Sequence, residues 1–279
     1  MTFGGQSQAE GHQNEPLLMS QAETTGERVQ VRVHGANASP TLIYLPGLHG
    51  NWCLVGGFRR AIADRVRFVE ITYPSTLTWT LEQYATSVEE ALAEHSVSEG
   101  WLLAESFSSQ VAWGLIARNQ FPLRGLILAG GFVQHPFRWG ALMAQRWCDD
   151  ISFSLLRRIL FGYARVSRLR FRRSPETFQE IREFIDRLTP RELQAVKHRL
   201  HLIAQSDFCA VARQAKLPIF ALSGLFDPIV PWAWVRPWLK KHCAALRQYR
   251  IIWHADHNVL GTASEKAANT IWQWMNERF

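Results

Sequence analysis

Between residues 41 and 129 the sequence alternates short, continuous apolar runs with segments in which apolar residues recur at helical spacing. Residues 41–45 and 101–104 are apolar without polar alternation, which is typical of strands covered on both faces. Residues 81–95 carry apolar side chains three and four positions apart, which predicts a helix. Because parallel strands need a crossover between them, the pattern predicts an α/β fold with a mostly parallel central sheet and helices on both faces.

The sequence pattern changes at two places, near residue 28 and after residue 131, and these changes predict how the chain is divided. Residues 29–33 alternate with period two ahead of the apolar run 41–45, which predicts an edge hairpin leading into the sheet. Residues 1 to 27 are rich in Gln, Gly, Glu and Ser, a composition that buries little apolar surface. After residue 131 the sequence becomes helix-like and rich in arginine, until a strand pattern resumes at 217–223. The predicted units are a flexible N-terminal tail (1–27), an α/β core (28–131 and 217–279) and a helical, arginine-rich cap (132–216) inserted after the sixth strand.

The predicted cap carries the basic character of the chain. It holds sixteen Lys and Arg against eight Asp and Glu, and the net charge of the whole chain is +7. Such a charged segment is usually a solvated surface. Four other interpretations stay open: an acidic partner such as an acyl-carrier protein, the phosphates of an acyl-CoA, an anionic membrane surface, and nonspecific nucleic acid. No recognised nucleic-acid motif accompanies the charge, so no specific nucleic acid is expected.

The cysteines and the N-terminus predict a cytoplasmic protein. Cys53, Cys148, Cys209 and Cys243 lack the spacing of a zinc site or of a disulfide framework, so they are expected to be free thiols. The N-terminal residues show no basic region followed by an apolar one, and no apolar run approaches the roughly 18 residues of a membrane span.

The apolar run 101–104 ends in Glu-Ser-Phe-Ser-Ser, and a helical pattern follows it. A serine on a sharp turn between a buried strand and a helix has an exposed hydroxyl next to the positive end of the helix dipole. The turn requires small residues two positions before and after the serine, and Ala104 and Ser108 are small. Ser106 is therefore predicted to be a nucleophile, although helix capping is the ordinary role of a lone serine at this position.

A serine nucleophile needs a base that an acid orients, in the chain order Ser, Asp or Glu, His. Asp227 follows the predicted strand 217–223, and His257 follows the last predicted strand. Asp256 is a weaker candidate acid, because its side chain alternates with that of His257 in an extended segment. His254, His49 and His135 are weaker candidate bases, and Glu105 is expected to be hydrogen-bonded within the turn.

The oxyanion of an acyl-transfer reaction needs two backbone N–H donors. Phe107, directly after the nucleophile, is predicted to supply one, and Leu48 in Leu-Pro-Gly-Leu-His-Gly the other. Gly47 and Gly50 allow that loop to turn sharply.

Five motifs in order make the chain resemble the α/β-hydrolase superfamily, specifically its capped members with a serine nucleophile. They are the loop at residues 45–50, Thr-Tyr-Pro at 72–74, Ala-Glu-Ser-Phe-Ser at 104–108, Gly-Leu-Phe-Asp-Pro-Ile-Val-Pro at 224–231, and Ala-Asp-His-Asn at 255–258. The resemblance implies an eight-stranded or slightly smaller sheet, catalysis through an acyl-enzyme, and no cofactor or metal.

The sequence thus predicts a serine esterase or thioesterase that acts on a small acyl ester or thioester, with Ser106, Asp227 and His257 as its triad. The residues expected to line the substrate pocket are His49, Trp52, Phe132 and Trp139. Perhydrolase or lyase activity on the same scaffold and a non-catalytic binding protein stay open. Dehalogenases and epoxide hydrolases of this fold use an aspartate nucleophile, so Ser106 argues against both.

Overall fold

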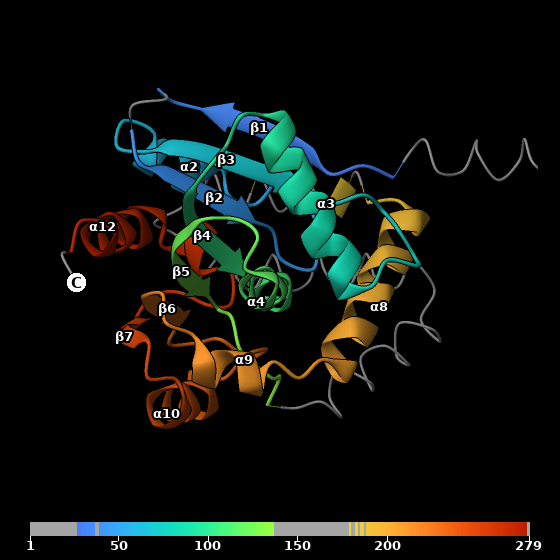
Figure 1. Cartoon of the computed structure of the whole chain (residues 1–279). Coiled ribbons are helices and arrows are strands. Elements are labelled where there is room, and N and C mark those ends of the chain that lie inside the picture. The colour runs from blue at the N-terminus through green and yellow to red at the C-terminus, as the bar shows by residue number, and fades with distance from the viewer. Residues whose placement is uncertain are drawn as a thin grey trace, which may run out of the picture.

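The computed structural model of the protein describes residues 27–36, 39–136, 179, 182–183, 185–186 and 188–277. A seven-stranded sheet runs through the centre in the order β1-β3-β2-β4-β5-β6-β7 (Figure 1). Every pairing in it is parallel except that of β1 with β3. The strands are β1 (Gln30–His34), β2 (Thr41–Leu45), β3 (Arg67–Thr72), β4 (Gly100–Glu105), β5 (Leu123–Ala129), β6 (Ile219–Gly224) and β7 (Leu246–Ile252). The predicted, mostly parallel sheet is confirmed.

The edge strand β1 pairs antiparallel with β3, with Gln30 opposite Thr72 and His34 opposite Phe68. The predicted hairpin between residues 29–33 and 41–45 was therefore wrong, because β3 lies between the two strands. Burial is consistent with this order. The side chains of β2 are largely inaccessible, as in an interior strand, whereas those of β1 are exposed or half-buried, as at an edge.

Helices cover both faces of the sheet and enclose two apolar cores. One core lies under α2 (Gly56–Ile62), α11 (Val259–Thr262) and α12 (Ser264–Met275). The other lies under α3 (Leu81–Glu94), α4 (Ser108–Arg118) and α10 (Trp232–His242). The two cores use alternate residues of the same strands, since side chains of a strand point to opposite faces in turn.

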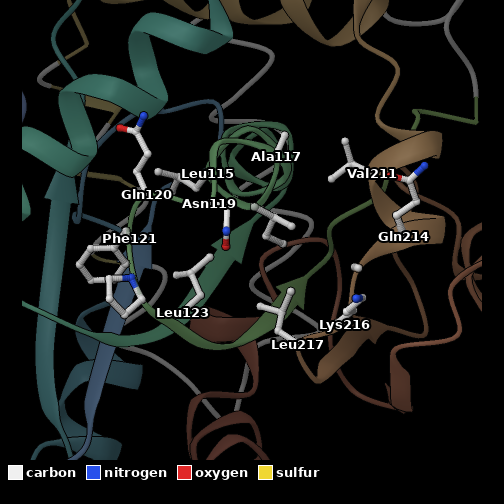
Figure 2. A pocket seen from close by; sticks show the side chains of 13 residues that line it. Leu115, Ala117, Asn119, Gln120, Phe121, Leu123, Val211, Gln214, Lys216 and Leu217 are labelled. Carbon is white, nitrogen blue, oxygen red and sulfur yellow. The ribbon is translucent and has the colours of Figure 1, made fainter.

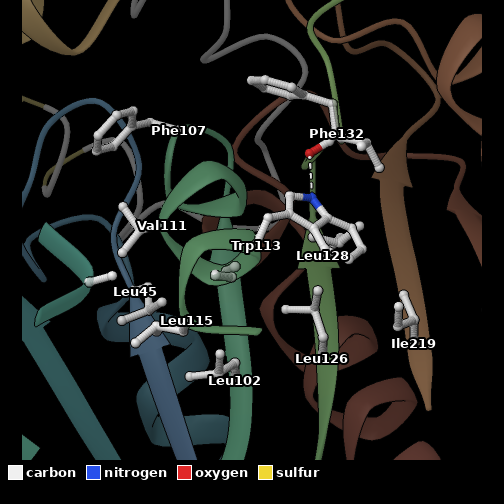
Figure 3. Packing of buried hydrophobic residues seen from close by; sticks show 14 of the residues in the cluster. Leu45, Leu102, Phe107, Val111, Trp113, Leu115, Leu126, Leu128, Phe132 and Ile219 are labelled. Atoms are coloured by element: carbon white, nitrogen blue, oxygen red, sulfur yellow. Dashed lines mark hydrogen bonds between the residues drawn. The ribbon is translucent and has the colours of Figure 1, made fainter. Parts of the chain in front are cut away.

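Trp113 connects the helix after Ser106 to the loop after β5. Its ring is fully buried in α4, beside Leu126 and Leu128 of β5, and its indole N–H donates a hydrogen bond of 3.0 Å to the Phe132 carbonyl (Figure 3). This bond satisfies the one polar atom of a large buried side chain and holds the end of β5 against α4.

The insertion predicted as a cap lies between β5 and β6. Within it the structure describes α8 (Pro190–Gln205), which starts at a capping box formed by Thr189 and Glu192, and α9 (Cys209–Gln214). The insertion follows the fifth described strand rather than the sixth, because the described residues before it form five strands, β1 to β5. Residues 137–178, which carry most of the predicted basic surface, lie outside the described residues. No helix in the described ranges combines the length and apolarity needed to cross a bilayer.

We expect substitution of two glycines by alanine to change the free energy of unfolding in opposite directions. A Cβ at Gly125 in β5 would lie 2.2 Å from the Trp101 ring, whereas a Cβ at Gly114 in α4 would lie 3.6 Å from Ala85. We expect Gly125→Ala to lower the free energy of unfolding by about 1–3 kcal/mol through overpacking. Gly114→Ala should raise it by roughly 0.5–1 kcal/mol, since alanine is the better helix former. Urea denaturation measures both, and changes of the same sign would contradict the packing described.

Candidate active site

Ser106 lies between the end of β4 and the start of α4 with a backbone φ of +48°. This left-handed conformation costs a residue other than glycine on the order of 1–3 kcal/mol, so the surrounding structure has to enforce it. The Ser106 N–H donates a hydrogen bond of 3.0 Å to the Ala129 carbonyl of β5, which anchors the turn. The N-cap residue of α4 is Phe107, and no side chain caps this end of the helix. The Ser106 hydroxyl is bonded to His257 instead of capping α4.

The Ser106 hydroxyl, His257 and Asp227 form one chain of hydrogen bonds. His257 Nε2 is 2.8 Å from Ser106 Oγ, and His257 Nδ1 is 2.8 Å from Asp227 Oδ2. The other oxygen, Asp227 Oδ1, accepts from the N–H groups of Ile229 and Val230 at 2.9 and 2.8 Å. Because a carboxylate only accepts, Nδ1 carries the proton and Nε2 is left to accept from the serine.

Two glycines, Gly130 and Gly224, let other strand ends approach the backbone around His257, and sequence analysis had given neither of them this role. Gly130, with φ +57°, lies after β5, and a Cβ there would meet the His257 carbonyl at 3.2 Å. Gly224 ends β6, and a Cβ there would approach the Asp256 carbonyl to 2.2 Å. Their positions directly after predicted strands were the available signal, because glycine at such places permits a close approach of two backbones.

The environment of His257 favours its protonated form. Burial by itself lowers the pKa of the imidazole, but the hydrogen bond and charge of Asp227 outweigh it, with smaller contributions from Glu105 and Asp256. The net effect raises the pKa above the ordinary 6.5. The imidazole is therefore arranged to take a proton from Ser106 and to be stabilised as a cation.

The two predicted oxyanion donors follow neighbouring parallel strands. In the register of β2 and β4, Leu45 lies opposite Ala104, so Leu48 and Phe107 each come three residues beyond a paired position. The loop of Leu48 is a tight turn in which the Gly50 N–H donates to the Gly47 carbonyl at 3.0 Å. Neither the Leu48 N–H nor the Phe107 N–H donates a hydrogen bond to another residue of the described ranges.

A buried polar cluster lies behind the serine. The Tyr44 hydroxyl donates a hydrogen bond of 2.5 Å to Glu105 Oε2, which is 3.9 Å from His49 Nε2. Burial lowers the pKa of His49, and Arg199 adds to that effect while Glu105 opposes it. His49 is thus a largely buried, neutral ring between the Leu48 loop and Glu105. Its predicted contact with substrate stays a prediction.

The remaining predicted residues fall in different places. Phe132 is buried, and its carbonyl accepts hydrogen bonds from Trp113 and Gln110. Trp52 packs against the core under α2 and beneath the guanidinium of Arg32, which is 4.6 Å from its ring centre. Trp139 lies outside the described residues. Substrate contacts of these three residues stay predictions.

The weaker candidates have other partners. Asp256 accepts from the N–H of Asn258 at 3.0 Å, next to the start of α11, and it is Asp227 that bonds to the His257 ring. The ring of His135 packs edge-on against Phe132, with ring centres 4.9 Å apart.

Two cavities differ in their relation to Ser106. One of about 360 Å³ is lined by residues 132–136, after β5, and by apolar side chains of α10, which follows the Asp227 loop. The other, of about 690 Å³, lies between the carboxyl end of α4, α9 and the segments that enter β5 and β6 (Figure 2). The larger cavity is therefore at the amino ends of the strands, away from the Ser106 hydroxyl, and the smaller one adjoins segments that carry the site.

No protein-family model and no curated protein sequence matches the chain. Solved structures do. An esterase from Rhodococcus sp. is 15% identical, covers 90% of this chain and 96% of its own, and has a TM-score of 0.75. An enol-lactonase from Burkholderia xenovorans is 16% identical, covers 91% and 98%, and has a TM-score of 0.75. A bromoperoxidase from Bacillus anthracis is 9% identical, covers 90% and 96%, and has a TM-score of 0.76. The chain has the α/β-hydrolase fold, as its motifs predicted.

The raised pKa of His257 predicts a pH dependence. If His257 is the predicted base, its neutral imidazole is the active form, so kcat/KM of an ester substrate should fall as the pH drops through a pKa above 6.5, the ordinary histidine value. Asp227→Asn removes the main stabilisation of the cation and should move this acidic limb to lower pH, while the rate falls steeply. Asp256→Asn, the matched control, should move the limb less. An acidic limb that is unchanged by Asp227→Asn would contradict the described environment.

Proposed function

We propose that the protein is a serine hydrolase that cleaves a carboxylic ester or thioester through an acyl-enzyme on Ser106. The observation that carries the proposal is the continuous hydrogen-bond chain Ser106–His257–Asp227 at a strained turn between β4 and α4. An esterase and an enol-lactonase among the structures with this fold support an ester-type substrate. The apolar cavity between the loop after β5 and α10 supports an acyl group as its occupant.

In the proposed reaction, His257 Nε2 takes the hydroxyl proton as Ser106 Oγ bonds to the substrate carbonyl carbon. The carbonyl electrons move onto oxygen, where the N–H groups of Leu48 and Phe107 stabilise the negative charge. When the carbonyl re-forms, the bond to the leaving oxygen or sulfur breaks and His257 returns its proton to that atom. Asp227 keeps the imidazole oriented and stabilises its cation throughout.

In the second half of the cycle, water gives a proton to His257 and its oxygen attacks the acyl carbon. Collapse of that adduct releases the acid and returns the proton to Ser106. Hydrogen peroxide in place of water would give a peracid, and the bromoperoxidase among the similar structures keeps this second reaction open. Lyase activity is the other open reaction of this scaffold. Product analysis with and without peroxide separates hydrolysis from perhydrolysis.

Labelling with a fluorophosphonate tests the nucleophile. We expect one labelled peptide in the wild type, containing Ser106, and none in Ser106→Ala, whose kcat on p-nitrophenyl esters should fall by at least about 10⁴-fold. Ser98→Ala, at an exposed serine before β4, is the control and should keep full labelling. An unlabelled wild type that turns over neither p-nitrophenyl esters nor acyl-CoAs would favour a non-catalytic binding protein.

A partner for the arginine-rich segment also stays a proposal: an acidic protein or an anionic surface would match its charge. The sequence alone supports it, since most of that segment lies outside the described residues.

A further inference from the structure

Arg199 of α8 is a buried arginine that reaches the loop of the predicted oxyanion donor. Only 2% of its surface is exposed. Its guanidinium donates to the Leu48 carbonyl at 2.8 Å, to the Pro74 carbonyl at 3.0 Å and to the Tyr84 hydroxyl at 3.3 Å. These acceptors come from three segments of the core, so one side chain of the insertion ties them together.

The guanidinium has no carboxylate partner within the described ranges, and its acceptors there are all neutral. Burying a cation without a counter-ion is unfavourable, and its hydrogen bonds recover only part of that free energy. An apolar side chain would fill the same space with less electrostatic cost. Stability alone therefore explains this arginine poorly. Its N–H groups instead point to a role in holding the Leu48 loop.

The Leu48 loop is held at three alternate carbonyls. Ser108 Oγ donates to the Pro46 carbonyl, Arg199 to the Leu48 carbonyl, and the Tyr73 N–H to the Gly50 carbonyl at 2.8 Å. The outer two anchors come from the α/β core. The central one comes from α8, which is part of the insertion.

The Leu48 carbonyl belongs to the central peptide of the turn that the Gly47–Gly50 hydrogen bond closes. A flip of this central peptide is what separates the common β-turn types, and it changes ψ of the residue whose N–H is the predicted donor. Gly50 leaves room for this contact. A Cβ there would lie 2.5 Å from the Arg199 guanidinium, and the φ of +76° also favours glycine.

We propose that Arg199 is a positioning residue for the oxyanion site: its hydrogen bond to the Leu48 carbonyl fixes the turn, so the site is complete only while α8 is docked on the core. The inference rests on the proposed hydrolase function and adds to it a dependence of catalysis on the insertion. The positive charge beside the loop also favours the negative charge that develops on the substrate oxygen.

Amide hydrogen exchange tests the positioning without any substrate. In Arg199→Ala, peptides that cover residues 46–52 and Tyr73 should exchange faster than in the wild type, while peptides of α12 should not change. Arg191→Ala is the matched control on the same helix, because Arg191 is exposed and donates to the Ser75 carbonyl and to Glu27. Unchanged exchange in the loop of a folded Arg199→Ala would overturn the proposal.

Steady-state kinetics then separate positioning from binding. We expect kcat of Arg199→Ala to fall by about 10- to 100-fold, as small misplacements at a reacting centre do. KM should change by less than about threefold, since the lost interaction acts on the transition state. Affinity for a trifluoromethyl ketone, which forms a tetrahedral adduct, should fall with kcat/KM, and Arg191→Ala should keep both. Wild-type kcat in Arg199→Ala would refute the inference and leave the hydrolase proposal intact.

Chemical rescue identifies the missing group. Millimolar guanidinium should restore kcat of Arg199→Ala in a saturable way, whereas urea, of similar shape but uncharged, should not. A loss that neither compound reverses would argue for a general structural defect and against positioning by this guanidinium.

Arg199→Lys keeps the positive charge but has fewer hydrogen-bond donors. It is the variant to test if Arg199→Ala does not fold. Folded Arg199→Lys with wild-type kcat and wild-type loop exchange would overturn the proposal, whereas reduced kcat with faster loop exchange would support it. If the wild type itself is neither labelled by a fluorophosphonate nor active, the hydrolase function fails, and the exchange result alone decides whether Arg199 holds the loop.

Discussion

Ser106, Asp227 and His257 reach one another because β4, β6 and β7 run in the same direction through one sheet and end at one edge. Ser106 and His257 are 151 positions apart in the sequence, yet their side chains lie 2.8 Å apart. Parallel pairing alone does not produce that distance. The left-handed backbone at Ser106, Gly130 after β5 and Gly224 at the end of β6 bring the three loops close enough to bond.

The same edge of the sheet is stiffened by buried polar contacts on either side of the serine. Tyr44 and Glu105 pair behind it, and the Trp113 indole fixes the loop after β5. Arg199 connects the insertion to the Leu48 loop. Buried polar groups of this kind specify one arrangement when all of them are satisfied, which is what the proposed oxyanion site requires.

Much of this arrangement could be predicted from local pattern. Continuous apolar runs identified the interior strands, and Ser106, Asp227 and His257 were selected because each follows such a run. The partner of β1 was mispredicted, because a single strand's periodicity reports which face is buried and says nothing about which strand lies beside it. Arg199 was counted only as part of a charged segment, because the local sequence of a helix does not indicate which groups the guanidinium of one arginine contacts in the folded protein.

The sequence by itself determined the class of fold, the order of Ser106, Asp227 and His257 after successive strands, and the loop with small residues around Ser106, because these follow from short-range periodicity and turn chemistry. Only the tertiary structure decided that β3 separates β1 from β2, that Asp227 rather than Asp256 bonds to His257, and that Arg199 lies on the Leu48 carbonyl. These are contacts between segments distant in sequence, and their distances depend on how the whole chain packs.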